Sequence, residues 1–362
     1  MSTRVRANTR GAAADDSRPK AQVLSRRQLL AAMACVCSVR ALGIRAAEPR
    51  DSDQERGAHA RRVVDVHAHY YPPALKALGE PTPMNSWSLE QHIESMEAAG
   101  VARSILSLTT PGVVATGEKG RALARESNEY AAKLCAEHPG RFGFFTYIQP
   151  DDTDAALREI EYGLDTLKGN GVGLFTSYGN RWLGDPQFEP VFAELERRQA
   201  VVYVHPTSPV CCTRLIPDLP DTLIEYGTDT TRAIASYVYR GAARRFPHVK
   251  MIWSHSGGTM PFLIERFEGA DRSAAAKGQV PEGFRAAAAK FFYDIAQASN
   301  PVATAALRSV VPVSHIVFGT DYPFRTPLDH VKALESGGVF SRAELQGLYR
   351  GNIEHDLPGL LS

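Results

Sequence analysis

Eight short runs rich in β-branched and aromatic residues follow one another after Arg61, separated by longer segments with helical patterns. This alternation predicts βαβ units and a parallel sheet. Eight parallel strands close a (β/α)8 TIM barrel, so we expect an α/β fold of that type. The expected strands are Val63–His67, Ser104–Leu108, Phe142–Ile148, Gly171–Phe175, Val201–His205, Lys250–Ser254, Phe291–Ile295 and His315–Gly319.

Helices are expected between these strands, most clearly over Leu89–Ala99, where apolar residues recur at helical spacing. A capping box of Ser341 and Glu344 predicts the start of a C-terminal helix. The long loop over 206–227 is expected at the catalytic face, where it could serve as a lid. The other expected helices are Ala122–Glu137, Ala155–Leu167, Phe188–Arg198, Thr230–Arg245 and Pro301–Ser309.

The first fifty residues differ in character from the rest, with ten Lys and Arg against three Asp and Glu. Arg26 and Arg27 precede a short apolar run over 29–39, a pattern typical of a twin-arginine export signal. We therefore expect a signal segment over 1–47, a flexible linker over 48–61 and one barrel domain over 62–362. The expected location is the periplasm, reached by the Tat route. The alternative is a disordered basic tail on a cytoplasmic protein.

The remaining chain carries a net charge of −6, because the whole sums to +1. A mildly acidic body is a poor binder of nucleic acid. The sequence has no run of eighteen apolar residues, so we expect no stable membrane association. The expected partner is a small molecule, and the frequency of closed twofold dimers makes a homodimer the assembly to test.

Histidine and aspartate residues stand at the carboxyl ends of four of the expected strands. His67 and His69 are two residues apart at the first strand end, so both imidazoles can face the barrel axis. His205 ends the fifth strand, His255 follows the sixth and Asp321 follows the eighth. Barrel enzymes assemble their active sites at these ends, and buried polar groups are costly to leave unpaired. The set therefore predicts an active site that holds zinc or a similar ion.

These motifs resemble those of the amidohydrolase superfamily. Within it they resemble the branch of aminocarboxymuconate-semialdehyde, γ-resorcylate and 6-methylsalicylate decarboxylases, over Val63 to the C-terminus. The resemblance implies the barrel of metal-dependent hydrolases, a metal ion held by His67, His69, His205 and Asp321, and His255 beside it as a catalytic acid and base. The stretches most similar to the 6-methylsalicylate type are 184–188, 205–209, 229–232 and 318–324.

One departure from the superfamily pattern bears on the number of metal ions. Many binuclear members use a carboxylated lysine at the end of strand four, whereas here Gly171–Phe175 is followed by Thr176. A bridging carbamate is thereby excluded, and one divalent ion is the simpler inference. We expect zinc, with manganese as the alternative, because three imidazoles and one carboxylate accept several ions.

The resemblance implies non-oxidative decarboxylation of an aromatic or unsaturated carboxylic acid similar to 6-methylsalicylate. The metal would bind the carboxylate and a neighbouring hydroxyl, and the ring carbon would be protonated before CO2 leaves. The proton would come from Asp321, as a second catalytic residue, or from metal-bound water assisted by His255. Two alternatives remain open: hydrolysis of a lactone, ester or amide on the same barrel, and an inactive barrel that only binds a ligand.

Candidate substrate-binding residues are less specific. Arg232 and Arg325 could clamp an anionic substrate, because a guanidinium pairs well with a carboxylate; a helix-surface position and a loop salt bridge are the alternatives. Asp65 is expected to orient a ligating imidazole. The candidates for an aromatic pocket, or for ordinary packing, are Trp87, Phe175, Tyr178 and Phe324.

Overall fold

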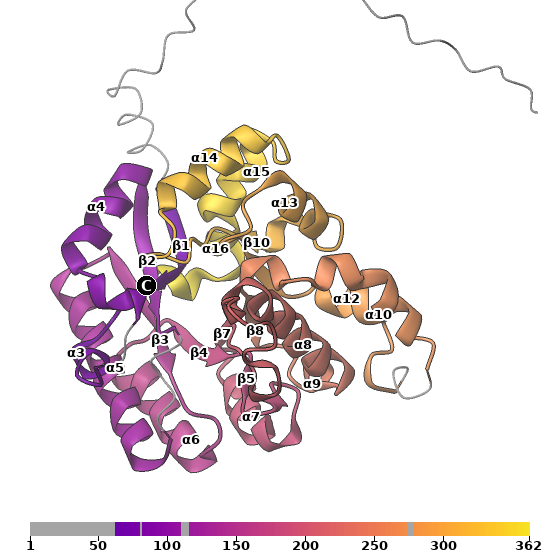
Figure 1. Ribbon diagram of the computed structural model, residues 1–362, viewed down its shortest axis with the longest axis horizontal. Coiled ribbons are helices and arrows are strands. Elements are labelled where there is room, and N and C mark those ends of the chain that lie inside the picture. The colour runs from indigo at the N-terminus through magenta and orange to yellow at the C-terminus, as the bar shows by residue number, and fades with distance from the viewer. Residues whose placement is uncertain (1–61, 80–81, 110–115, 274–277) are drawn as a thin grey trace, which may run out of the picture. The chain divides into compact units, whose positions relative to one another are not determined.

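One sheet of eight parallel strands organises the chain (Figure 1). The computed structural model describes residues 62–79, 82–109, 116–273 and 278–362. The signal segment expected over 1–47 and the linker expected over 48–61 lie outside these described residues.

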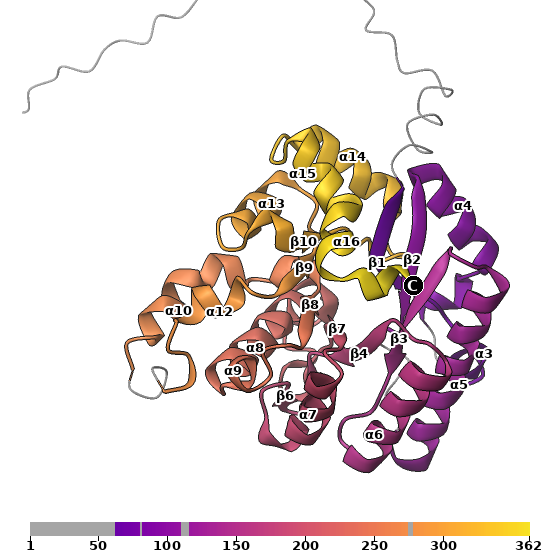
Figure 2. The ribbon, with the colours of Figure 1, turned by 180° about the vertical axis from the view of Figure 1, so that it is seen from behind.

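Each of the eight strands expected from the sequence is present, and each pairs in parallel with the next one in the sheet (Figures 1 and 2). The strands, in sheet order, are β1 (Val63–His69), β2 (Val101–Ser107), β3 (Phe142–Tyr147), β4 (Gly171–Phe175), β7 (Val201–His205), β8 (Lys250–Trp253), β9 (Phe292–Asp294) and β10 (Ile316–Val317). A small antiparallel hairpin after β4, which was not expected, consists of β5 (Ser177–Tyr178) and β6 (Arg181–Trp182).

The chain that follows β10 completes the barrel against β1, because β10 itself has only two residues. The Val66 N–H donates to the Phe318 carbonyl oxygen, with 3.0 Å between nitrogen and oxygen. The His69 N–H donates to the Tyr322 carbonyl oxygen over 2.8 Å, and Ala68 and Tyr322 form an isolated parallel bridge. The strands therefore form a nearly closed barrel, which confirms the predicted (β/α)8 fold.

Helices between the strands cover the outside of the barrel (Figures 1 and 2). In α4, the Ser88 hydroxyl accepts from the Gln91 N–H at the start, and Gly100 ends the helix in the left-handed conformation. The predicted capping box of Ser341 and Glu344 is confirmed. The helices are α3 (Pro73–Lys76), α4 (Leu89–Ala99), α5 (Gly117–Glu137), α6 (Thr153–Glu161), α7 (Glu189–Arg197), α8 (Glu225–Tyr239), α9 (Ala242–Arg245), α10 (Ile264–Ala270), α12 (Phe284–Ala288), α13 (Pro301–Arg308), α14 (Pro327–Gly337), α15 (Arg342–Gln346) and α16 (Asn352–Asp356).

The single helix expected over Thr230–Arg245 is two helices in the structure, and α8 begins earlier than expected. Gly241, with φ of 75°, separates α8 from α9, and a Cβ at this position would lie 2.1 Å from Gln279 Oε1. The first turns of α8 contain the buried residues Glu225 and Asp229. Tertiary packing therefore extends this helix into a segment of weak helix formers.

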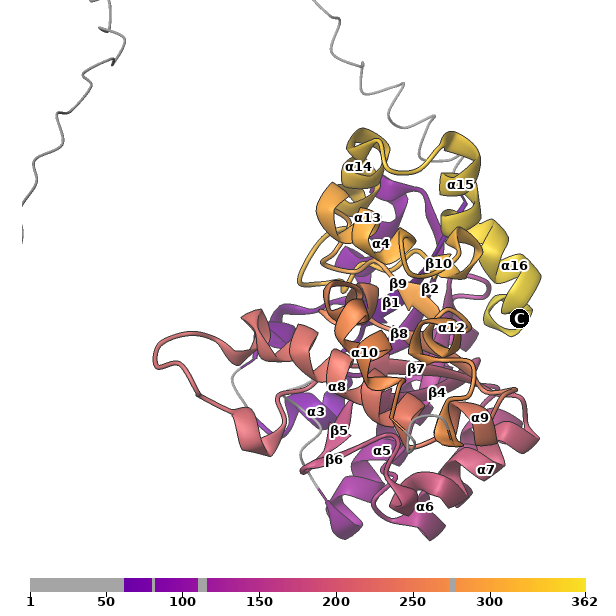
Figure 3. The same ribbon diagram turned by 90° about the vertical axis from the view of Figure 1, so that its right-hand side faces the viewer.

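The last residues of the chain close one end of the barrel. Ile353, Leu357 and Leu360 belong to one buried cluster with strand residues that include Val64 and Val66; we name this cluster the barrel floor. Figure 3 shows the C-terminus on one side, and on the opposite side the projecting loop between β7 and α8. The carboxyl ends of the strands therefore form the mouth of the barrel. Within the described ranges, the longest apolar helical stretches fall short of what a membrane span requires.

Candidate metal centre

The end of β1 brings His67 and His69 together. The register of β1 against β2 is irregular between Asp65 and Ala68, and a bulge of this kind re-aims side chains. Val66 belongs to the barrel floor, yet the next residue, His67, also contacts the barrel interior, with its ring 5.2 Å from that of Tyr203. The Nε2 atoms of His67 and His69 are 3.2 Å apart, which confirms that both imidazoles share one side.

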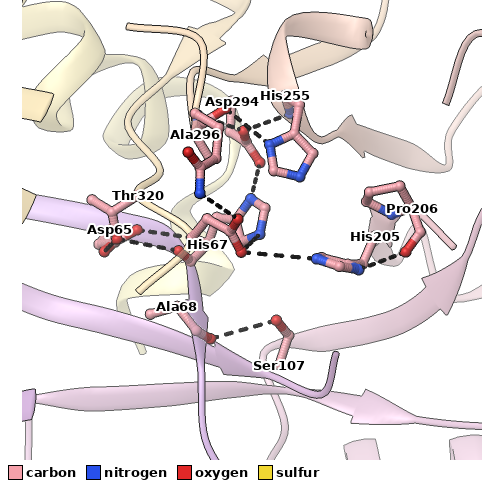
Figure 4. A network of polar contacts seen from close by, with 12 residues as sticks. Asp65, His67, Ala68, Ser107, His205, Pro206, His255, Asp294, Ala296 and Thr320 are labelled. Atoms are coloured by element: carbon pink, nitrogen blue, oxygen red, sulfur yellow. Dashed lines mark hydrogen bonds and ion pairs between the residues drawn. The ribbon is translucent and has the colours of Figure 1, made fainter. Parts of the chain in front are cut away.

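His205, His255 and Asp321 converge on the same point from three other strand ends. Asp321 Oδ1 lies 2.8 Å from His69 Nε2, 3.2 Å from His67 Nε2 and 3.9 Å from His205 Nε2. One potential ligand atom from each of His67, His205, His255 and Asp321 lies within 4.8 Å of the others. All five predicted residues thus form one group, and Figure 4 shows three of its imidazoles turned toward one another.

All four imidazoles present the same nitrogen to this group. Each Nδ1 lies within hydrogen-bond distance of an oxygen that can only accept, so we assign the proton to Nδ1 and a lone pair to Nε2. The acceptors are the Asp294 carboxylate for His67 (2.9 Å) and the carbonyl oxygens of Ser107 for His69 (3.2 Å), Pro206 for His205 (2.8 Å) and Ala296 for His255 (2.9 Å). In their neutral forms the imidazoles therefore turn lone pairs toward the Asp321 carboxylate, an arrangement that a cation satisfies.

The electrostatics of the group also favour a cation. Burial acts to lower the pKa of His67, but the Asp294 and Asp321 carboxylates beside it raise that pKa above its ordinary value. Burial acts to raise the pKa of Asp321, but the imidazoles of His205, His67 and His69 around it hold that pKa well below its usual range. Burial lowers the pKa of His205 to about 3. The site therefore attracts positive charge at His67, where a divalent ion would take the place of the proton, while a neutral His205 and an ionised Asp321 are already in the ligand forms that such an ion needs.

The hydroxyl of Thr176, directly after β4, is hydrogen-bonded to Asp229. Thr176 Oγ1 donates to Asp229 Oδ2 over 2.5 Å, and Asp229 also accepts from Ser177 and from the Trp182 indole. Thr176, at the strand end where the superfamily pattern would place a carboxylated lysine, is thus tied into a structural hydrogen-bond network. This supports the inference of a single ion.

The turn after β8 holds His255 in a strained backbone conformation. His255, Ser256, Gly257 and Gly258 have φ values of 53°, 58°, 73° and 65°. A left-handed conformation costs a non-glycine residue roughly 1–2 kcal/mol. A Cβ at Gly258 would lie 2.0 Å from the Gly227 carbonyl oxygen, so this turn packs directly on the start of α8. Such strain is concentrated at functional sites, where the surrounding structure enforces it.

Two residues of the site were not predicted from the sequence. The Asp294 carboxylate at the end of β9 accepts from His67 Nδ1 and from the His255 backbone N–H, both over 2.9 Å. Gln297 Nε2 donates to Asp321 Oδ2 over 3.1 Å. The rule that found the other residues, a polar side chain at a strand end, would also have found Asp294. The expected strand ran one residue too far, to Ile295, and hid it.

Asp65 does not orient an imidazole, and that prediction was wrong. Its Oδ1 accepts from the His67 backbone N–H over 3.0 Å, and its Oδ2 accepts from the Thr320 hydroxyl over 2.6 Å. The irregular register of β1 places Asp65 beside the backbone of His67 (Figure 4). Asp294, from a distant part of the sequence, holds the ring instead.

The predicted aromatic residues occupy different places. Phe324 is 41% exposed with its ring 6.0 Å from that of His69, which places it at the rim of the site. The Phe175 ring lies 6.2 Å from that of His205, and the Tyr178 hydroxyl accepts from the Phe175 N–H. Trp87 is buried, with its ring edge-on to another buried side chain, and so takes part in core packing.

The two predicted arginines and the predicted lid lie around the mouth. Arg232 is half-buried on α8, and its Nη1 is 3.0 Å from Glu225 Oε2, an ion pair that neither the substrate clamp nor its alternative, a helix-surface position, had anticipated. Arg325 is half-buried in the loop that follows Asp321. A substrate role for either stays a prediction, as does the lid. The exposed apolar side chains of the loop between β7 and α8 are Val210, Leu215, Ile216, Leu223 and Ile224.

A barrel with this group at its mouth has the architecture of a known family of enzymes. The family model described as amidohydrolase matches residues 64–355, which is most of the chain. The protein belongs to the amidohydrolase family.

Individual relatives narrow the similarity to decarboxylases. The chain is 38% identical over 273 residues to the 6-methylsalicylic acid decarboxylase of Penicillium expansum, covering 72% of this chain and 84% of that one. It resembles the crystal structure of 2,6-dihydroxybenzoate decarboxylase complexed with 2,6-dihydroxybenzoate, with a TM-score of 0.73, 20% identity, and coverage of 82% and 99%. It also resembles a Polaromonas dihydroxybenzoic acid decarboxylase with bound manganese and 2-nitroresorcinol, with a TM-score of 0.71, 18% identity, and coverage of 82% and 96%. The predicted resemblance to the decarboxylase branch is confirmed.

Proposed function

We propose that the protein is a metal-dependent, non-oxidative decarboxylase of an aromatic carboxylic acid similar to 6-methylsalicylate. The observation that carries this is the convergence of four imidazole Nε2 atoms and the Asp321 carboxylate, in a chain 38% identical to a 6-methylsalicylic acid decarboxylase. The named relatives favour decarboxylation over hydrolysis of a lactone, ester or amide. An inactive barrel is disfavoured because all five positions hold side chains competent for the chemistry.

The residues of the chain supply binding and proton transfer. A divalent ion held by His67, His69, His205 and Asp321 would supply a Lewis acid for the substrate carboxylate and a neighbouring hydroxyl. In the proposed acid form His255 carries a proton on each ring nitrogen: Nδ1–H donates to the Ala296 carbonyl oxygen, and Nε2–H delivers its proton to the ring carbon that bears the carboxylate. A C–H bond forms there first. The C–CO2 bond then breaks, and its electron pair returns to the ring as CO2 leaves and aromaticity is restored.

The geometry favours His255 over Asp321 as the source of the proton. Asp321 Oδ1 lies among the histidine Nε2 atoms, where it would bind the ion, and Oδ2 accepts from Gln297, so both oxygens are already engaged. His255 Nε2, by contrast, is a buried nitrogen without a hydrogen-bond partner among the described residues. We therefore assign proton delivery to His255.

The direct test is an assay of the full chain, loaded with zinc or with manganese, against 6-methylsalicylate and 2,6-dihydroxybenzoate. Decarboxylation predicts release of CO2 with formation of 3-methylphenol or resorcinol, and loss of activity when a chelator removes the ion. A panel of lactones, esters and amides is run in parallel. Ring-opened or cleaved acids without CO2 release would replace this proposal with a hydrolase.

Zinc is the ion we propose, with manganese as the alternative. Three imidazoles and one carboxylate suit zinc, whereas the Polaromonas neighbour contains manganese. Elemental analysis of the purified protein distinguishes the two ions.

We also keep the proposals of Tat-dependent export and of a homodimer. The first is supported by the twin arginines before a short apolar run, and the second only by the frequency of twofold dimers. Cell fractionation tests the export, and analytical ultracentrifugation tests the homodimer.

A further inference from the structure

We infer that Asp294 is a positioning residue whose single carboxylate fixes the metal-binding tautomer of His67 with one oxygen and the position of His255 with the other. We call His67, His69, His205, His255 and Asp321 the metal group. The part of the inference that concerns His67 depends only on the metal group. The part that concerns His255 rests on the proposed decarboxylation.

The two oxygens of Asp294 have separate tasks. Oδ2 lies 2.9 Å from His67 Nδ1. Oδ1 accepts from the backbone N–H of His255 and from that of Ala296, each over 2.9 Å (Figure 4). Asp294 and His67 are both fully buried, so water does not compete for these bonds.

His67 differs from the other three histidines in what fixes its tautomer. The Nδ1 atoms of His69, His205 and His255 each have a backbone carbonyl oxygen to donate to, which the fold keeps in place, although His69 Nδ1 also lies 3.1 Å from the Ser107 hydroxyl. His67 Nδ1 instead donates to the side-chain carboxylate of Asp294. A substitution at Asp294 is therefore able to move the proton of His67 without disturbing the other three rings.

The same carboxylate supports the strained turn after β8. His255 has a positive φ of 53°, and its backbone N–H is held by Asp294 Oδ1. Two residues further along the same segment, the Ala296 carbonyl oxygen accepts from His255 Nδ1. The segment Asp294–Ala296 is thus hydrogen-bonded to both the backbone and the ring of His255, while Asp294 is also hydrogen-bonded to His67.

Gly319 allows this close arrangement. A Cβ at Gly319 would lie 2.8 Å from the Cβ of His67 and 2.9 Å from the Cβ of Asp294. Any side chain there would push against both residues. The backbone after β10 therefore lies directly against the His67–Asp294 pair.

The substitution Asp294→Asn separates the two tasks. Two backbone N–H groups point at the Oδ1 position, so the amide oxygen occupies it and the NH2 group faces His67 Nδ1. An NH2 group only donates, so His67 must accept through Nδ1 and carry its proton on Nε2, where the metal binds. We expect the affinity for zinc to fall by about 10- to 100-fold, in the range for lost partners of ligating histidines. Competition with a fluorescent zinc chelator measures this without any substrate.

The substitution Asp294→Ala removes both tasks. At saturating zinc, Asp294→Asn should recover much of the wild-type kcat because His255 keeps its backbone acceptor. Asp294→Ala should stay about 100-fold or more below wild type, the range for loss of a positioned acid–base group. Equal kcat values for the two variants at saturating zinc would overturn the link to His255.

Asp229→Asn is the matched control. Asp229 is also a fully buried carboxylate, but it accepts from Thr176, Ser177 and Trp182 and lies outside the metal group. We expect unchanged zinc affinity in this variant. Wild-type zinc affinity in a folded Asp294→Asn protein, judged by circular dichroism of the metal-free form, would overturn the tautomer assignment.

A measurement on the wild-type chain covers the case in which the Asn variant does not fold. In the zinc-loaded protein, imidazole nitrogen NMR should show His67 bound through Nε2 with its proton on Nδ1; the reverse would overturn the inference. Failure of the proposed function looks different. In that case CO2 is not released from any acid tested, while zinc affinity still depends on Asp294.

Discussion

His205 ends β7 and His255 follows the neighbouring strand β8, but we expect different results from the same substitution. His205→Gln removes a ring whose Nε2 faces Asp321, so metal content and activity should fall together. His255→Gln should keep the metal and lose about 10²- to 10⁴-fold in decarboxylation rate, the usual worth of a general acid–base group. Elemental analysis beside a CO2 assay measures both. His355→Gln, at a side chain that is 84% exposed, serves as the control. Loss of metal from His255→Gln would make His255 a fifth ligand instead.

At the residue scale, the sequence predicted the side chains that form the candidate metal centre but not the side chains that hold them in position. His67, His69, His205, His255 and Asp321 could be found because each stands near a strand end, and strand ends meet in a barrel. Gln297 could not be found in this way. It lies in a loop, and its bond to Asp321 depends on how two loops fold toward each other.

The turn after β8 is the element whose backbone the site most depends on. Gly258→Ala would place a Cβ 2.0 Å from the Gly227 carbonyl oxygen, at a φ of 65°. Gly338→Ala has almost the same φ, 67°, but meets no atom within 4 Å. The free energy of unfolding of the control, Gly338→Ala, should therefore fall only by the cost of a left-handed backbone in a non-glycine residue, about 1 kcal/mol. Gly258→Ala should lose roughly 1–3 kcal/mol more from overpacking, and much of its activity, because the turn holds His255. Denaturant unfolding compares the two, and equal losses would show that the turn has room to shift.

At the element scale, the strands were predictable because buried parallel strands are short apolar runs between turn signals. The start of α8 was not, since its first turns contain glycine and threonine and are stabilised by burial of Glu225 and Asp229. The β5–β6 hairpin was missed for a related reason. Each of its strands has only two residues, and its Trp182 is held by the distant Asp229.

On the scale of the whole molecule, one end of the barrel is closed by the C-terminal residues, whose burial stabilises the fold. The other end, at the carboxyl ends of the strands, contains the candidate metal centre. The sequence predicted a C-terminal helix that packs on the barrel, and the structure has α15 and α16 there. The sequence did not reveal that Leu357 and Leu360, which follow α16, form part of the barrel floor. That contact depends on the path of the chain beneath the strands, which local patterns do not encode. Closure next to β10 likewise depends on Phe318 and Tyr322, which lie outside the strand itself.

Leu360→Ala tests whether packing at the barrel floor affects stability without affecting the metal centre. Leu360 is fully buried in the barrel floor, so truncating it should cost about 2–5 kcal/mol of unfolding free energy. Leu360 lies in the C-terminal part of the floor, near the amino ends of the strands, whereas the metal group lies at their carboxyl ends, so metal content and kcat should stay at wild-type values below the melting transition. Thermal unfolding and the CO2 assay on one preparation measure both quantities. Val302→Ala, at a side chain that is 68% exposed, should change stability by less than about 0.5 kcal/mol. Because Val66 of the floor directly precedes His67, loss of metal in a folded Leu360→Ala protein would show that the bulge in β1 transmits packing of the floor to the site.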